Sequence, residues 1–325
     1  MKAFAVNQRL LPTLAGLFVF LVIYALGSFI YPNFSSLRVM MNLFTDNAFV
    51  GVIAITMTFV IISGGIDLSI GSVIAFTGVL AAKLLEQGYD PLAIIGFTLL
   101  SGALFGFAMG YCIHVFEMPA FLVTLTGMFL ARGAAFWLTL QSIPIKNELF
   151  DKMVDFHIDL GFKSSLSLNA LIFLIIALLG IFIAHFTQFG RWVYAIGGDE
   201  SSARMMGLPV GRVKMLIYTI NSTACALAGL VFSLYTLSGY PLATVGLELD
   251  VIAAVVIGGT LMTGGVGYIE GTVIGVLILE LIQTLINFQG TLSSWWTKIA
   301  IGVLLFVFIM LQTYITKSSA KRNQA

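Results

Sequence analysis

Charged residues are scarce in this sequence. Only 10% of its 325 residues are charged, and 16 Lys and Arg nearly balance 15 Asp and Glu, which leaves a formal net charge of +1. Soluble domains carry about 25% charged residues, and nucleic-acid-binding proteins need a surplus of basic ones. The composition therefore excludes a soluble enzyme, a disordered tail and a nucleic-acid partner.

Catalytic and metal-binding motifs are also missing. The two cysteines, Cys112 and Cys225, lie inside apolar runs, so we expect neither a disulfide nor a metal site from them. There is no Gly-Lys pair, and hence no Walker A phosphate loop, and neither a His-Glu-x-x-His nor a Gly-x-Ser-x-Gly motif. We expect no enzyme activity, no bound metal and no cofactor; ATP and Mg²⁺, where used, would be bound by a partner chain.

Apolar residues dominate what is present, with a hydrophobic fraction of 59% and a mean hydropathy of +1.03. A membrane-spanning helix needs about 20 mostly apolar residues. We therefore predict an all-α integral membrane protein with about ten transmembrane helices in a single domain, residues 1–325. The predicted spans are Leu11–Ile30, Met40–Ile62, Ile70–Leu85, Leu92–Ile113, Ala120–Leu140, Leu168–His185, Leu216–Leu237, Val251–Met262, Tyr268–Phe288 and Trp295–Thr316. The third and eighth are too short to cross comfortably alone.

The distribution of Lys and Arg predicts the orientation, because these residues gather in cytoplasmic loops. With an even number of spans, both ends of the chain lie on the same side as the loop 186–214. That side carries Lys2, Arg9, Arg191, Arg204, Arg212, Lys214, Lys317, Lys321 and Arg322. The largest loop on the other side, 141–167, has charges of both signs. We predict that both termini face the cytoplasm.

A short pattern occurs twice, and its second copy lies 200 positions after the first. The copies read SGGI at 63–66 with GSVI at 71–74, and TGGV at 263–266 with GTVI at 271–274. Glycine-interrupted apolar segments at corresponding positions of two halves indicate the pathway of a transporter. We predict repeat-like halves at 40–140 and 216–316. Ten spans make this repeat parallel, and one span miscounted between the copies would make it inverted.

The first copy, Ser63–Gly71, joins two adjacent glycines to an acidic residue in an apolar setting. Adjacent glycines weaken a helix, and Asp67 needs a polar partner there. One interpretation is a broken helix that lines or hinges the translocation path. The other is a tight cytoplasmic turn in which Asp67 caps the helix that begins near Ser69. The candidate hinge residues of both copies are Gly64, Gly65, Asp67, Gly71, Gly264, Gly265, Gly267 and Gly271.

Two predicted spans carry polar stripes. Asn42 and Asp46 lie one helical turn apart on the second span. Glu280, Gln283 and Asn287 follow i, i+3, i+7 spacing on the ninth. Amide and carboxylate groups can replace the hydrogen bonds that a sugar makes with water, so these five residues are candidates for the solute path. Hydrogen bonding between helices is the alternative.

Glycines spaced four apart form two further stripes. They are Gly102, Gly106 and Gly110 on the fourth span, and Gly267, Gly271 and Gly275 on the ninth. Small residues at this spacing let two helix backbones approach closely. We predict that these faces pack helix against helix and bind no ligand.

The loop 186–214 contains the signal of a short helix. Asp199 is a good N-cap for a helix over Ser201–Met206, and Gly207 would end it. A helix this short is not stable alone. A docking partner could supply the missing contacts, and an ordinary surface turn is the alternative.

Three motifs resemble the ribose-type permease family of bacterial carbohydrate ABC importers, and the similarity runs along nearly the whole chain. They are SGGIDLSIGSVIAF at 63–76, YAIGGDESSARMMGL at 194–208 and VIGGTLMTGGVG at 256–267. Two more segments, NLFTDNAF at 42–49 and LSSWWTKIAIG at 292–302, resemble most the branch of galactofuranose importer permeases. Permeases of that branch pair with a second, related permease.

The resemblance implies a type II-like ABC importer permease fold in the bacterial inner membrane and the import of a monosaccharide, galactofuranose. It implies a cytoplasmic ATPase subunit, a second permease subunit or second copy of this chain, a periplasmic sugar-binding protein and membrane lipid as partners. Gly197–Leu208 would be the coupling helix seated in the ATPase, with Asn in most of the family where this chain has Asp199. The residues implied in coupling are Gly197, Gly198, Asp199, Glu200, Arg204 and Gly207.

Two alternatives stay open at this point. A ribose or autoinducer-type solute is the nearest one within the same family. A secondary transporter driven by an ion gradient is the rival from another class, and it would use Asp46 or Glu280 as an ion site.

Overall fold

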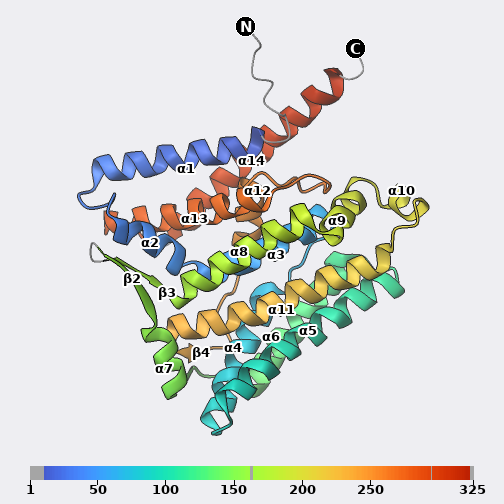
Figure 1. Cartoon of the computed structure of the whole chain (residues 1–325). Helices are drawn as coiled ribbons and strands as arrows, with labels where there is room; N and C mark the ends of the chain where they lie inside the picture. The colour runs from blue at the N-terminus through green and yellow to red at the C-terminus, as the bar shows by residue number, and fades with distance from the viewer. Residues whose placement is uncertain (1–10, 162–163, 294, 323–325) are drawn as a thin grey trace.

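The computed structural model describes residues 11–161, 164–293 and 295–322 (Figure 1). Its helices are α1 (Leu11–Ile30), α2 (Leu37–Thr45), α3 (Ala48–Ile62), α4 (Ile70–Glu86), α5 (Pro91–Val115), α6 (Ala120–Leu138), α7 (Glu148–Asp155), α8 (Leu168–Phe186), α9 (Gln188–Gly198), α10 (Glu200–Met205), α11 (Val210–Thr236), α12 (Leu247–Ile257), α13 (Ile269–Gln289) and α14 (Trp295–Arg322). Its strands are β1 (Ile143–Pro144), β2 (His157–Gly161), β3 (Ser164–Ser167) and β4 (Ser238–Gly239). The two termini, predicted to be cytoplasmic, lie outside the described residues together with Lys2 and Arg9.

Seven of the described helices are long and apolar enough to cross a membrane. They are α1, α5, α6, α8, α11, α13 and α14, and the bent pair α2–α3 makes an eighth if it counts as one span. The helix α4 coincides with a predicted span to within one residue, and α12 overlaps another only over residues 251–257. Their 17 and 11 residues fall short of the usual length of a span. The chain is a mostly helical, multi-pass membrane protein, and the predicted count of about ten spans is not confirmed.

The predicted span Met40–Ile62 is not one straight helix, because α2 and α3 meet at a bend of 58°. Two polar residues, Asp46 and Asn47, lie between the helices. The side-chain amide of Asn47 donates to Glu280 of α13, so this residue faces a polar partner outside its own helix. A polar bend is tolerated at this depth because protein surrounds it.

The glycine stripe of α5 packs against α11, as predicted. A methyl group built on Gly106 would overlap the backbone of Tyr218 and the side chain of Ser222, and one on Gly110 would lie 2.9 Å from the Cα of Met215. The stripe of α13 packs on α12 in the same way. Close backbone approach of this kind is the main source of helix association in membranes.

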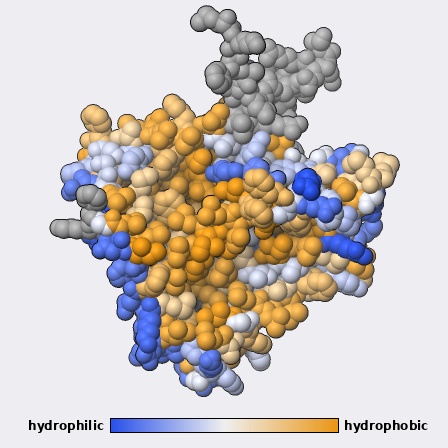
Figure 2. Space-filling model, viewed as in Figure 1, coloured by the Kyte–Doolittle hydropathy of each residue, from blue (hydrophilic) through white to orange (hydrophobic). Residues whose placement is uncertain are grey.

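The core of the molecule is built around α3, in which every residue except Phe49 is buried. The outer helices α1, α6 and α14 instead expose apolar side chains such as Phe18, Phe129 and Val303, which are 60–67% exposed. Outward apolar faces of membrane helices contact lipid tails. Figure 2 shows a broad apolar surface with hydrophilic patches toward its margins.

The bundle has two different ends (Figure 1). One, which we call the α10 end, carries α9 and α10; the other, the hairpin end, carries α7, β2 and β3. At the hairpin end β2 pairs antiparallel with β3, and β1 pairs with β4. The chain is therefore mostly helical, and the predicted all-α fold is supplemented here by short strands. The chain between the helices is not helical here, and its backbone N–H and C=O groups find hydrogen-bond partners in short antiparallel strand pairs.

Candidate functional site

The short helix predicted near Asp199 is confirmed as α10. The Asp199 carboxylate accepts hydrogen bonds from the N–H groups of Ser201 and Ser202, at 2.9 and 3.1 Å, and so caps the helix. The helix spans Glu200–Met205, one residue earlier than predicted, and ends at Gly207, whose φ of 80° favours glycine. The predicted loop is thus largely helical, since α9 precedes α10 directly.

Gly197 and Gly198 are the last two residues of α9. Gly197 lies directly against the end of α3, and a methyl group built on it would overlap the carbonyl oxygen of Ile62 and approach the backbone nitrogen of Gly265 to 2.6 Å. At Gly198 no described atom outside the local backbone lies within 4 Å of such a methyl group. Position 197 therefore accepts only glycine, whereas position 198 has room for a side chain.

The two copies of the repeated pattern meet at Gly197. The N–H of Gly265 donates to the carbonyl oxygen of Ile62 at 2.8 Å, and a methyl group on Gly264 would lie 3.1 Å from both the Gly197 oxygen and the Gly64 nitrogen. We call these five residues the glycine junction. The chain enters it from α3 and from α12 and continues from it toward α4 and α13, an order that parallel and inverted repeats share, so the orientation of the repeat stays a prediction. The predicted halves stay a prediction.

The segment 63–69, which separates α3 from α4, is called the first break below. Asp67 of this segment is fully buried against α11. Its carboxylate accepts hydrogen bonds from the N–H and hydroxyl of Ser69, at 2.8 and 2.7 Å, and from the side-chain amide of Asn221 at 2.9 Å. The N-cap of α4 is Ser69 and not Asp67, and no side chain among the described residues caps the helix, so Asp67 bonds just ahead of the first helical residue, Ile70. The bond to Asn221 ties the break to α11, which the sequence did not predict. The hinge function of Asp67 stays a prediction.

Some of the predicted hinge glycines lie inside or beside packed helices. Gly71, in the first turn of α4, leaves room for the carbonyl oxygen of Thr244, and Gly271, in the first turn of α13, does the same for Gly258. Gly267 packs against the side chain of Thr260 just before α13. The structure gives these glycines a packing function, and their hinge function stays a prediction.

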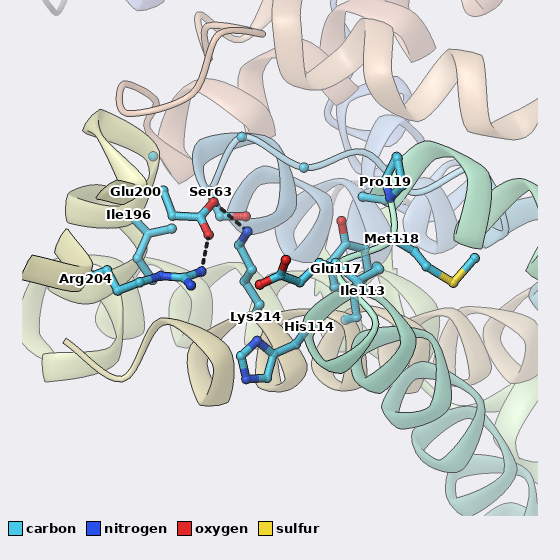
Figure 3. Close-up of a pocket in the computed structure, with 15 residues that line it drawn as sticks. Ser63, Ile113, His114, Glu117, Met118, Pro119, Ile196, Glu200, Arg204 and Lys214 are labelled. Atoms are coloured by element: carbon cyan, nitrogen blue, oxygen red, sulfur yellow. Dashed lines mark hydrogen bonds and ion pairs between the residues drawn. The ribbon is translucent and has the colours of Figure 1, made fainter. Parts of the chain in front are cut away.

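A pocket of about 540 Å³ opens at the α10 end, between α9–α10 and the connection from α5 to α6 (Figure 3). Glu200 binds Lys214 at 2.6 Å and Arg204 at 3.2 Å, while Glu117 and His114 reach the pocket from the end of α5. Partial burial alone would raise the pKa of Glu200, but Lys214 and Arg204 outweigh it and lower the pKa below its ordinary value. Glu200 is therefore ionised, and its carboxylate is bound by Lys214 and Arg204 of the same chain.

A second pocket, of about 510 Å³, lies toward the hairpin end among α2, α3 and α11–α14. Four of the five predicted path residues, Asp46, Glu280, Gln283 and Asn287, line it. Asn42 is exposed one turn earlier on α2 and is not among the described residues that line the pocket. The structure thus brings together the acidic and amide groups of two helices that the sequence only placed on separate stripes. Their contact with a solute stays a prediction.

Both Glu280 and an ion pair line this second pocket. Glu280 is buried and accepts hydrogen bonds from the amide of Asn47 and, at 3.3 Å, from the hydroxyl of Thr284. Lys298 of α14 forms an ion pair with Asp250 of α12. A concave site with several convergent polar groups can bind a small polar molecule.

The helix α3 separates the two pockets. Val50, near its start, lines the pocket toward the hairpin end, and Ser63, just after its end, lines the pocket at the α10 end. At 1.5 Å per residue this distance is about 20 Å of helix, and the residues between are buried. Packed side chains therefore form a barrier between the two pockets.

Several residues of these sites were not found from the sequence. Asn221 could have been found, because an amide inside an apolar segment needs a partner. The pair of Asp250 and Lys298 could not, since its members lie on different helices with no spacing rule between them. Among the residues that the structure describes, no group of three or more His, Cys, Asp and Glu could hold a metal ion.

Comparisons with known proteins agree with this architecture. The model of the family described as "Branched-chain amino acid transport system / permease component" matches residues 39–309. The chain is 51% identical to the inner membrane ABC transporter permease protein YjfF of Escherichia coli, over 93% of this chain and 91% of YjfF. It is 37% identical to the fructose import permease protein FruG of Bifidobacterium longum, over 96% and 93% of the two chains.

A third relative, the ribose import permease protein RbsC of Escherichia coli, is 33% identical over 95% of this chain and 94% of its own length. No solved structure matches the chain significantly. The matched proteins are permeases, so this chain is a transport component and not an enzyme. It belongs to the family of branched-chain amino acid transport system permease components.

Proposed function

We propose that the chain is the transmembrane permease subunit of a bacterial ABC sugar importer in the inner membrane. ATP is hydrolysed by a separate cytoplasmic ATPase subunit, and a periplasmic sugar-binding protein delivers the sugar at the hairpin end. The relatives named for fructose and ribose import support a sugar as the solute. The segments 42–49 and 292–302 favour galactofuranose, and with it a second, related permease as partner.

The glycine junction is the observation that carries this proposal. Gly197 of α9 contacts Ile62 and Gly265 through backbone atoms, so the segment next to α10 touches both copies of the repeat. On α10 and just after it, Met205 and Met206 are 80% and 69% exposed, and exposed Met side chains are frequent at binding surfaces. A partner that binds α10 is therefore connected, through α9, to the end of α3 and to the segment between α12 and α13.

This connection gives a transport mechanism without chemistry on the solute. When the ATPase pair closes, α9 and α10 move. The backbone contacts at the glycine junction carry that movement to the first break and to the corresponding segment 258–268 between α12 and α13. The helices around α3 then repack, which opens the barrier toward the α10 end and closes the pocket toward the hairpin end. A bistable packing of this kind is the usual basis of alternating access.

The pocket toward the hairpin end supports a sugar as the solute. Its carboxylates and amides, from Asp46, Glu280, Gln283 and Asn287, can accept and donate hydrogen bonds to several hydroxyl groups at once. Its volume of about 510 Å³ is in the usual range for small-molecule sites. Selection among sugars is shared with the binding protein.

The solute is tested by uptake of labelled sugars in cells that express the whole importer. We expect uptake of labelled galactose in its furanose form, with little competition from ribose, fructose or an autoinducer-type compound. Equal or stronger competition by ribose would replace galactofuranose with the nearest alternative. Uptake that stops when the proton and sodium gradients collapse, with ATP still present, would support the ion-coupled rival that uses Asp46 or Glu280.

The orientation is tested by labelling single cysteines with a membrane-impermeant maleimide. In a background where Cys112 and Cys225 are replaced by Ser, Ser201→Cys should react only from the cytoplasm. Asp159→Cys, at the hairpin end, should react only from the periplasm. The reverse pattern would place α10 where no ATPase can reach it and would refute the coupling assignment.

A further inference from the structure

The helix α11 carries three polar residues on the face that it turns toward α10 and the first break. Lys214, Tyr218 and Asn221 follow i, i+4, i+7 spacing, which places them on one side of a helix. They run inward from the pocket at the α10 end, because Lys214 is partly exposed whereas Tyr218 and Asn221 are buried. We call these three residues the α11 stripe.

The α11 stripe contacts α10 at one end and the segment between α3 and α4 at the other. Lys214 binds Glu200 of α10 at 2.6 Å. The hydroxyl of Tyr218 donates to the carbonyl oxygen of Ile66 at 3.4 Å. The stripe therefore connects α10 at one end to the segment between α3 and α4 at the other, over about 10 Å of helix.

At its buried end the stripe joins a satisfied polar network. Asn221 donates to Asp67 at 2.9 Å and accepts from the hydroxyl of Thr56 at 2.8 Å. Asp67 also accepts two bonds from Ser69. In a buried site each of these groups would lose its partner if α11 moved relative to the break, which is costly because no water replaces the bond. The network holds α11 and the first break in one fixed relation.

Other polar residues of α11 do not make such connections. Thr219 and Thr223 bond to the carbonyl oxygens of Met215 and Thr219, one turn earlier on the same helix. Polar side chains on a membrane helix can thus be satisfied locally. The stripe residues, in contrast, bond to α10, to α3 and to the segment between α3 and α4. They therefore connect segments rather than only satisfying their own hydrogen bonds within α11.

We propose that the α11 stripe is a second coupling path, which transmits movement of α10 to the first break independently of the glycine junction. Lys214, Tyr218 and Asn221 are positioning residues, which act through their contacts with α10, with α3 and with the segment between α3 and α4. The proposal rests on the proposed function, because it needs a partner that moves α10. It differs from a purely structural function in one consequence, which is that breaking the stripe separates ATP hydrolysis from sugar movement.

The test uses the complete importer in proteoliposomes and measures ATP hydrolysed and sugar accumulated in the same sample. For Asn221→Leu we expect hydrolysis stimulated by the binding protein to stay within about twofold of the wild type, while the ATP used per sugar rises about tenfold. Thr219→Ala and Thr223→Ala, on the same helix, are the matched controls and should keep the wild-type ratio. An unchanged ratio in Asn221→Leu would overturn the proposal.

Three further single variants and one double variant keep the test decisive if Asn221→Leu folds poorly. Tyr218→Phe removes one hydroxyl and keeps the ring, and it should raise the ratio about threefold. Glu200→Lys and Lys214→Glu should each raise the ratio, and the double variant should bring it back to within about twofold of the wild type. Parallel loss of hydrolysis and uptake, or a double variant no better than the single ones, would reduce the stripe to a structural feature. A wild-type importer without ATP-dependent uptake would instead refute the proposed function.

Discussion

The backbone N–H of Gly265 donates a hydrogen bond of 2.8 Å to the carbonyl oxygen of Ile62, and Gly197 packs against the same oxygen. These residues come from three segments that are far apart in the sequence. Because only backbone atoms make the contact, no side chain can change its rotamer to absorb a displacement. Any movement of α9 must therefore move the ends of both repeat copies.

Replacement of Gly197 by Ala should uncouple or disable the transporter. The added methyl group overlaps the carbonyl oxygen of Ile62, and overpacking of this kind costs about 1–3 kcal/mol. Since 1.4 kcal/mol corresponds to a factor of ten, a cost of this size should lower sugar uptake about fivefold or more. Uptake per amount of protein in the membrane is the measurement.

The neighbouring position provides the control for this experiment. A methyl group at Gly198 meets no described atom within 4 Å, so Gly198→Ala should keep uptake within about twofold of the wild type. Equal losses in both variants would mean that α9 ends in a general contact surface rather than in a specific junction.

The glycine stripe of α5 should contribute to the unfolding free energy of the chain, because it packs closely against α11. In Gly106→Ala the methyl group overlaps the backbone of Tyr218 on α11, and the unfolding free energy should fall by about 1–3 kcal/mol. Gly96, on the same helix, has open space at its missing side chain among the described atoms, so Gly96→Ala should leave the Tm unchanged or slightly raised. Thermal unfolding in detergent, followed by tryptophan fluorescence, compares the two variants. A larger loss in Gly96→Ala would contradict the packing.

Glu280 and Asn42, one residue from each polar stripe, should differ in their effect on transport when replaced by Ala. Glu280 is buried in the wall of the pocket toward the hairpin end, so Glu280→Ala should lower uptake at least about tenfold, partly because it leaves Asn47 without its partner. Asn42 is exposed outside that pocket, so Asn42→Ala should change uptake by less than about twofold. Uptake at several sugar concentrations separates a change in KM from a change in maximal rate. A strong effect of Asn42→Ala would move the path toward α2.

The capping residue Asp199 should act through its oxygen atoms rather than its charge. The hydrogen bonds from the side chain of Ser201 and the N–H of Ser202 hold its pKa below the ordinary value of 3.8. A lowered pKa stabilises the helix at every pH above that ordinary value and loses this effect only as the pH falls through the lowered one.

Near neutral pH, therefore, Asp199→Asn, which keeps a capping oxygen, should retain uptake with an unchanged pH profile. Asp199→Ala should lose most of it. The measurement is ATP-dependent uptake over a pH series for both variants. A profile that shifts in Asp199→Asn would show that the charge itself contacts the ATPase.

Local signals in the sequence predicted local structure well. The cap at Asp199 and the end of α10 at Gly207 depend on residues within a few positions of one another, so their chemistry can be found from the sequence. The glycine stripe of α5 was predictable for the same reason. The bend between α2 and α3 was not predicted, and Asn47 at the bend bonds to Glu280 of α13, a residue far away in the sequence.

Contacts between distant segments could not be predicted from periodicity or spacing. The repeat suggested related positions for Gly64 and Gly264, but nothing in the pattern indicated that the two loops touch each other and Gly197. The network of Asn221 and Asp67 joins α11 to the first break in the same way. Such sites depend on the packing of helices, which the hydrophobic pattern of each helix leaves undetermined.

Reconstitution in proteoliposomes tests most directly the claim that movement is powered from outside this chain. With the ATPase subunit, the second permease, the binding protein and ATP, wild-type vesicles should accumulate sugar, and vesicles with the Gly197→Ala variant should accumulate it several-fold more slowly. Omission of the ATPase subunit alone should abolish accumulation even with ion gradients imposed across the membrane. Accumulation of sugar by the purified chain alone, under an ion gradient and without ATP, would contradict the account.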